Sequence, residues 1–196
     1  MLACGALASE LRAVLAAGDL TDHVEVRYLP ANLHNRPERI APALEPMLEA
    51  AADRQVLVAY ADCGTGGGLD RLLDRFPNAT RLPGAHCYEV FAGSVAFAEL
   101  AEDEPGTFFL TDFLAKHFDA LVWEGLGLDR HPQLRDAYFG NYTRVVLLSQ
   151  RADAVVTAAG EAAATRLGLA FEHRHVGLTT FAAAVATPLR ITERVG

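Results

Sequence analysis

Short hydrophobic runs that alternate with stretches of helical period constrain this sequence more than any other feature. The runs are rich in β-branched and aromatic residues, as β-strands are, and they cover Val24–Leu29, Gln55–Ala61, Thr107–Thr111, Arg144–Ser149 and Ala170–His175. Met1–Ala3 is interpreted as the end of a first strand. The helical patterns cover Leu7–Ala17, Pro37–Asp53, Leu69–Phe76, Tyr88–Glu102, Asp112–Trp123, Leu134–Tyr138, Ala152–Leu167 and Thr180–Ala186. Alternation of this kind predicts an α/β fold.

Two of these runs indicate how the strands pair. Val56–Ala59 and Val145–Leu148 are hydrophobic without a break, which is typical of strands buried on both faces of a parallel sheet. We see no internal repeat, low-complexity segment or linker in the sequence. We therefore expect a single α/β domain over residues 1–196, built on one doubly wound, mostly parallel sheet flanked by helices.

Charge and composition exclude several classes of function. The chain carries 25 acidic and 17 basic residues, for a net charge of −8, and has no Lys/Arg run, so a nucleic-acid partner is not expected. No apolar stretch reaches the roughly 18 residues of a membrane-spanning helix, and no signal peptide is recognisable. Three cysteines are an odd number and too few for a disulfide scaffold, which favours a reducing compartment. We expect a cytoplasmic protein without a membrane partner.

All three cysteines are expected at turns that lead from a strand into a helix. Cys4 follows the first strand, Cys63 follows Gln55–Ala61, and Cys87 opens a helical pattern. In a parallel α/β sheet such turns gather at the carboxyl edge, where ligands bind. Helix N-termini favour thiolate over thiol, so we expect three thiolates of low pKa on one edge.

Three thiolates around one cavity repel each other unless a cation neutralises them, which predicts a metal site. The candidates are zinc held by three cysteines with a histidine or an open position, and an iron–sulfur cluster with one iron left to another ligand. His86, next to Cys87, is a candidate fourth ligand or acid–base group. No C-x₂-C pair is present, and free cysteine often packs as a small hydrophobic residue, so three core cysteines remain the competing interpretation.

A glycine-rich loop follows Cys63 and provides an alternative site without metal. Gly64, Thr65, Gly66 and Gly67 connect a strand to a helix and match neither a Walker loop nor a dinucleotide-binding fingerprint. The loop could bind a carboxylate or phosphate. His34 and Arg36 follow the strand Val24–Leu29 and are expected on the same edge, where arginine can bind such an anion; a simple helix entry is the alternative for them.

A third hypothesis assigns the chain a docking role. Residues Gly125–Tyr142 combine glycine, charged and aromatic side chains before a strand, which is compatible with a lid or an interface for a partner, or with a glycine-punctuated helical connection. Phe and Leu residues in the later helices are compatible with a homodimer.

Five segments together resemble one domain family: Ala3–Leu7 (ACGAL), Leu33–Glu38 (LHNRPE), Tyr60–Gly67 (YADCGTGG), His86–Glu89 (HCYE) and Gly127–Asp129 (GLD). The family has no known function, occurs in bacteria and methanogenic archaea, and is often encoded near corrinoid-dependent methyltransferases of one-carbon metabolism. The resemblance implies that Cys4, Cys63 and Cys87 match the family's three cysteine motifs. It also implies a role close to methyl transfer, with a corrinoid protein or methyltransferase as partner. The chain departs from the family at its N-terminus, where members usually carry several more residues that complete the first strand.

Overall fold

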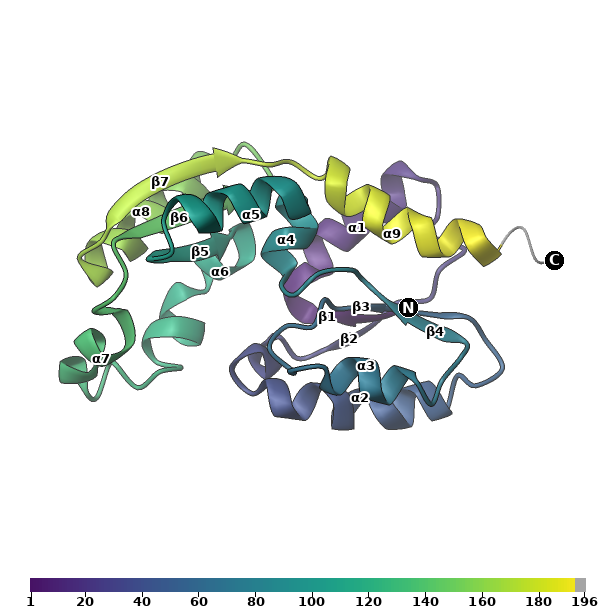
Figure 1. Ribbon diagram of the computed structural model, residues 1–196. Helices are drawn as coiled ribbons and strands as arrows, with labels where there is room; N and C mark the ends of the chain where they lie inside the picture. The colour runs from purple at the N-terminus through teal and green to yellow at the C-terminus, as the bar shows by residue number, and fades with distance from the viewer. Residues whose placement is uncertain (193–196) are drawn as a thin grey trace. The chain divides into compact units, whose positions relative to one another are not determined.

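The computed structural model describes residues 1–192, and the side chains of residues 1–188. The chain forms two compact units: one holds residues 1–90 and the described residues from 178 onward, and the other holds Phe91–Gly177. Each unit has its own parallel sheet (Figure 1). The α/β class is confirmed, but the prediction of one sheet was wrong. The prediction of a single domain over residues 1–196 stays a prediction.

The first unit contains a four-stranded sheet in the order β2-β1-β3-β4. Its strands are β1 (Leu2–Cys4), β2 (Arg27–Leu29), β3 (Val56–Ala59) and β4 (Ala79–Arg81), and all neighbours are parallel. The chain goes from β1 outward to β2 and then returns to β3 on the other side of β1. The sheet therefore has a topological switch point between β1 and β3, the place where open α/β sheets bind ligands.

Helices cover both faces of this sheet. They are α1 (Ala8–Ala17), α2 (Ile40–Glu49), α3 (Gly68–Leu73) and α9 (Thr179–Thr192). In Figure 1, α2 and α3 lie on one face, and α1 and α9 lie on the other. Right-handed crossovers produce this arrangement when the strand order reverses. Every residue of β3 is buried, as are Leu11 of α1 and Leu44 and Leu48 of α2, so the core lies on both faces.

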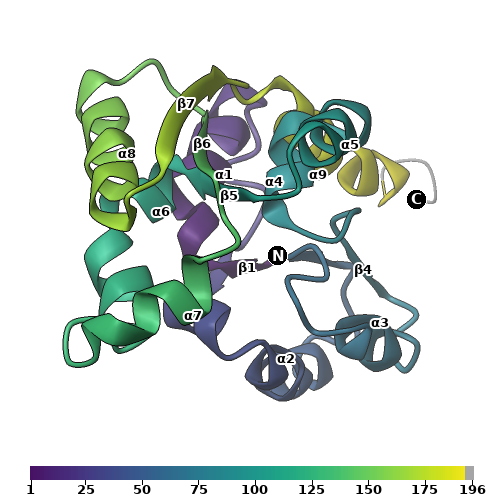
Figure 2. The ribbon, with the colours of Figure 1, turned by 60° about the vertical axis from the view of Figure 1, so that its left-hand side comes forward.

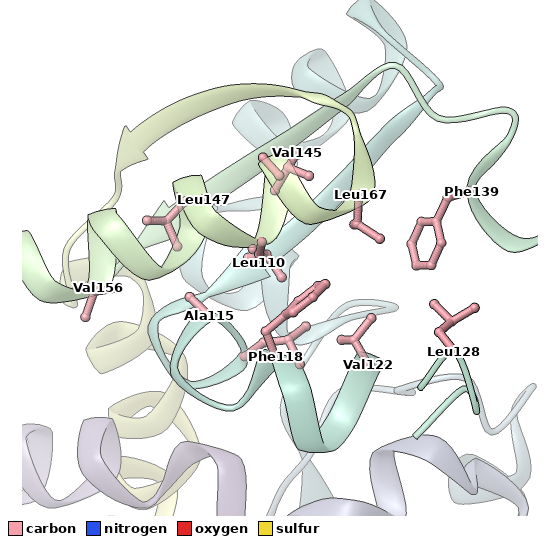
Figure 3. Close-up of a cluster of buried hydrophobic side chains, with 13 residues drawn as sticks. Leu110, Ala115, Phe118, Val122, Leu128, Phe139, Val145, Leu147, Val156 and Leu167 are labelled. Atoms are coloured by element: carbon pink, nitrogen blue, oxygen red, sulfur yellow. The ribbon is translucent and has the colours of Figure 1, made fainter. Parts of the chain in front are cut away.

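The second unit is built on the parallel strands β5 (Thr107–Thr111), β6 (Arg144–Ser149) and β7 (Ala170–His175), with β6 in the centre. Its helices are α5 (Ser94–Asp103), α6 (Asp112–Lys116), α7 (Arg135–Phe139) and α8 (Ala154–Leu167). Figure 2 shows α8 beside the sheet. Figure 3 shows the cluster of buried hydrophobic side chains, which includes Leu110, Val145, Leu147, Val156 and Leu167.

Three differences from the predicted elements have local causes. The predicted helix Tyr88–Glu102 is divided into α4 (Cys87–Ala92) and α5, because Gly93 has φ 86°, which an α-helix does not contain. The predicted helix Asp112–Trp123 is divided into α6 and a π-helical turn at Asp119–Trp123. Strand β4 was not predicted, since its three residues are few and only partly apolar. Among the described helices, none combines the length and the hydropathy that a membrane crossing requires.

Candidate functional site

The carboxyl edge of the first unit's sheet carries the cysteines predicted to lie there. Cys4 is the last residue of β1, Cys63 lies in the loop after β3, and Cys87 is the first residue of α4, after β4. The strands β1, β3 and β4 are neighbours in the sheet. The prediction that the three cysteines follow strands on one sheet edge is therefore confirmed, and two of them flank the switch point.

Cys63 has an unusual backbone conformation. Its φ is 51°, in the left-handed region, which is uncommon for a residue with a Cβ atom. The N–H groups of Asp62 and Cys63 donate to the carbonyl oxygens of Gly84 and Ala85, at 3.1 and 2.8 Å. These two bonds join the loop after β3 to the loop that leads to Cys87. A left-handed non-glycine residue costs about 1–3 kcal/mol and persists only where the surroundings impose it.

The glycine loop closes on a carboxylate of its own. Asp62 accepts hydrogen bonds from the Thr65 hydroxyl at 2.6 Å and from the N–H groups of Gly66 and Gly67 at 3.1 and 2.9 Å. The bond from Thr65, followed by those from the two glycines, lowers the pKa of Asp62. An external anion at Gly66 and Gly67 would compete with this carboxylate. The anion-binding role of Gly64, Thr65, Gly66 and Gly67 stays a prediction, and the geometry of the loop does not favour it.

The three thiols do not have the low pKa values that helix N-termini suggested. Burial raises the pKa of Cys63 to about 12, with a contribution from the nearby Cys4. Burial also raises the pKa of Cys87, with contributions from both Cys63 and Cys4, and burial raises the pKa of Cys4. The expectation was wrong because desolvation of the thiolate outweighs the backbone hydrogen bonds that favour it. The same interactions show that the thiols lie close enough to influence each other electrostatically.

Tyr60, which directly follows β3, reaches the same region from the interior. Its side chain is only 2% exposed. Within the part of the chain that the structure describes, the Tyr60 hydroxyl has no conventional hydrogen-bond partner. It interacts instead with the thiol of Cys4, and sulfur is a weak partner. Sequence analysis missed Tyr60 because it continues an apolar run and its hydroxyl carries no motif.

The histidines at this edge come from loops after the two outer strands. His34 follows β2 and His86 follows β4, and both side chains are exposed. Surrounding protein atoms lower the pKa of His34, and the charge of His86 lowers it further. The two imidazoles therefore come near each other although β1 and β3 lie between their strands. Their roles as ligands or proton carriers stay predictions.

Two arginines at this edge differ in their surroundings. Arg36 is exposed, and its guanidinium makes no ion pair with any residue of the described chain. Arg81, at the end of β4, donates to both carboxylate oxygens of Asp70, at 2.5 and 2.9 Å. It also donates to the carbonyl oxygens of Leu82 and Gly84, at 2.8 and 3.1 Å. Arg81 thus fixes the loop before Cys87, and sequence analysis missed it because β4 was missed.

No single-ion site is preformed in the described residues. Between residues 1 and 192, no group of three or more His, Cys, Asp or Glu side chains is arranged so that it could hold one metal ion. Neither His86 nor His34 forms part of such a group of ligands in the described residues.

The segment Gly125–Tyr142 belongs to the second unit and contributes to its core. Leu128 and Phe139 are buried there, whereas Tyr138 is 46% exposed. A docking role for this segment stays a prediction.

The first unit is thus an open parallel α/β unit with polar and thiol side chains at its switch point. The chain matches the model of the family described as Protein of unknown function (DUF1638) over residues 28–185, and it belongs to that family. The matched region contains Cys63, Cys87, His34 and His86, and it starts after Cys4. Neither the curated proteins nor the solved structures contain a match to this chain.

Proposed function

We propose that this protein binds an iron–sulfur cluster through Cys4, Cys63 and Cys87. The observation that supports the proposal is the placement of three desolvated thiols at the ends of three adjacent parallel strands, where each thiol pair interacts electrostatically. Thiols with raised pKa values do not ionise together without a cation. Iron bound to the sulfurs would supply that positive charge, because a coordinating thiol is deprotonated.

Three cysteine sulfurs are the donor set typical of an iron–sulfur cluster, whereas structural zinc usually takes four protein ligands. Zinc requires its ligands in one tetrahedral shell at about 2.0–2.3 Å from the metal, and the described residues contain no such group. A cluster contains several iron and sulfide ions and is held by cysteine sulfurs, which therefore lie further apart than the ligands of one ion. Zinc is the alternative occupant that the experiment distinguishes.

The strained backbone at Cys63 supports a functional site at this place. A left-handed cysteine is stabilised here by the bonds from Asp62 and Cys63 to the next loop. Strain of this kind gathers at active sites and ligand clamps. An ordinary core cysteine needs no such conformation.

Three cysteine ligands would leave one position of the cluster to another ligand. The exposed side chains of His34, Arg36 and His86 belong to the same sheet edge, and they would meet a small molecule that approaches this position. When bound, the cluster supplies electron transfer or a site for that molecule. The family resemblance supports a role beside corrinoid or one-carbon methyl transfer, with a corrinoid protein or methyltransferase as partner.

The metal-free alternative is less well supported by the geometry. It assigns the glycine loop to a carboxylate or phosphate, but the N–H groups of Gly66 and Gly67 already donate to Asp62. It predicts that alanine at each cysteine leaves ligand affinity intact and that loss of Arg36 abolishes it.

Single serine variants of the cysteines test the proposal. The protein is purified without oxygen, reconstituted with iron and sulfide, and compared with Cys4→Ser, Cys63→Ser and Cys87→Ser. Each variant is expected to lose most of the bound iron and sulfide, while His131→Ala, an exposed histidine of the second unit, retains them. Three variants that bind as much iron as the unchanged protein would overturn the proposal.

A further inference from the structure

The first unit contains a cavity at the amino edge of its sheet, opposite the edge that carries the cysteines. Its volume is about 1120 Å³, and the described residues that line it all belong to this unit. They come from α1, α2, α9, the loop between α1 and β2, and the amino ends of the strands. Ligand pockets measure about 300–1,000 Å³, so the space is large enough for a small molecule.

The helices α1 and α9, which cover the same face of the sheet (Figure 1), give the cavity its apolar character. Both contribute small residues, among them Ala17 of α1 and Ala182 of α9, and these leave the space open. Val14, Leu20 and Val185 are larger apolar residues of the same lining. Protein interiors contain few voids larger than a water molecule, and apolar hollows at a surface mark binding sites. The cavity is therefore suited to a hydrocarbon group.

A cluster of charged side chains lies at the rim of this cavity. Glu25 accepts hydrogen bonds from Arg27 at 2.7 Å and from Arg54 at 3.0 Å, and all three residues belong to the lining. Arg27 begins β2 and Arg54 precedes β3, the strands on the two sides of β1. The carboxylate of Asp53 is 3.9 Å from Arg54 and 85% exposed, so solvent screens it. The cluster thus has two positive charges and one negative charge.

Both arginines retain donors for a second anion. A guanidinium has five N–H donors, and the bonds to Glu25 use one from Arg27 and one from Arg54. The glycine loop differs, because the N–H groups that could hold an anion there already donate to Asp62. Arginine binds carboxylates through two parallel hydrogen bonds. A carboxylate at the rim would balance the excess positive charge while an attached hydrocarbon chain fills the cavity.

We propose that the first unit binds an amphiphilic monocarboxylate, a molecule with a hydrocarbon chain and one carboxylate end, in this cavity. The chain contacts the apolar side chains of α1 and α9, and Arg27 and Arg54 hold the carboxylate. The site lies at the edge of the sheet opposite the cysteines and is independent of the proposed metal group. Its test therefore needs no metal, and its failure would leave the metal proposal unaffected.

Octanoate and octanol are the probes, since they share a hydrocarbon chain and differ in the charge of the end group. Their affinities for the full chain are measured by isothermal titration calorimetry. Ala182→Trp and Ala17→Trp each fill part of the cavity, and Ala17 is exposed, so its replacement retains a folded protein if the other does not. Arg54→Gln removes one charge at the rim. Circular dichroism and melting temperature report whether each variant is folded.

Two substitutions in the second unit are the matched controls. Ala162→Trp places the same ring at an exposed alanine of α8. Arg174→Gln removes an arginine that also pairs with a glutamate and is 57% exposed, against 52% for Arg54.

The unchanged protein is expected to bind octanoate at one site and more tightly than octanol. The tryptophan variants lose most of the affinity for both probes, because they occupy the space of the hydrocarbon chain. Arg54→Gln weakens octanoate binding about tenfold, the effect of one charge-assisted hydrogen bond, and leaves octanol binding unchanged. The controls bind both probes as the unchanged protein does.

Two results would overturn the inference. Octanoate that does not bind the unchanged protein, or that binds the folded tryptophan variants as tightly, would show that the cavity is not a binding site. Octanol that binds as tightly as octanoate, together with unchanged octanoate binding in Arg54→Gln, would refute the role of the arginines and the anionic class of ligand.

Discussion

The left-handed backbone at Cys63 leads to a prediction about two substitutions at one position. In ordinary conformations, glycine is less stable than alanine by about 0.5–1 kcal/mol, because glycine loses more conformational entropy on folding. At φ 51°, a residue with a Cβ atom costs about 1–2 kcal/mol that glycine does not. The second effect outweighs the first. We therefore expect Cys63→Gly to be more stable than Cys63→Ala by about 0.5–1 kcal/mol.

Cys4 offers the matched control for this comparison. Its φ and ψ are −65° and 131°, an ordinary extended conformation, so Cys4→Ala is expected to be more stable than Cys4→Gly by about 0.5–1 kcal/mol. The four variants are compared without metal by urea unfolding, and in a chain of this size a change of 1 kcal/mol also shifts the melting temperature by about 2–4 °C. If alanine is the more stable replacement at both positions, Cys63 is not strained, and that support for a functional site is lost.

Two further predictions concern the same sheet edge. Gly5→Ala should lower the free energy of unfolding by about 1–3 kcal/mol, because the added Cβ would lie 2.8 Å from the backbone oxygen of Leu29. Gly18→Ala is the control and should be tolerated, since its Cβ would lie 3.5 Å from the nearest atom. Equal urea midpoints for the two variants would contradict the close approach at Gly5. Hydrogen bonds from Arg81 lower the pKa of Asp70, so the stability that this pair contributes is present above the ordinary Asp pKa of about 3.9 and is lost as the pH falls through the lowered value. Asp70→Asn should therefore be less stable than the unchanged protein at neutral pH and equal to it in strong acid, and a pH-independent difference would refute the ion pair as its cause.

The sequence predicted the bounds of three strands to the residue: Thr107–Thr111, Arg144–Ser149 and Ala170–His175. The first two are largely apolar runs rich in β-branched or aromatic residues, whereas Ala170–His175 is mostly polar and lies between Gly168 and Gly177. The short strand β4 contains a threonine and an arginine, so its pattern does not differ from that of a loop.

The number of sheets could not be predicted from the pattern of single strands. Hydrophobic runs indicate that a strand is buried, but not with which strand it pairs. Val56–Ala59 and Val145–Leu148 were assigned to one sheet, whereas they are inner strands of two separate sheets. A chain with one fully buried strand in each half can form either one sheet or two, so the pattern does not decide between them.

The site was predictable in position more than in chemistry. Cys4 and Cys63 follow strands that were predicted, and parallel pairing then places them at one edge. Cys87 joins them through β4, which was not predicted. Their raised pKa values could not be predicted, because they depend on how much water the fold removes from each sulfur. The use of the Gly66 and Gly67 N–H groups by Asp62 also depends on the loop conformation, which has four positive φ values between Cys63 and Gly67.

Iron and acid-labile sulfide in the unchanged protein, purified and reconstituted without oxygen, are the most direct test of the central claim. The same sample is assayed for zinc, and its absorption spectrum is recorded before and after reduction. The account predicts stoichiometric iron with a matching amount of sulfide, and a broad visible absorption that weakens on reduction. Protein that contains neither iron nor zinc, with all three cysteines titrating as free thiols after unfolding, would contradict it.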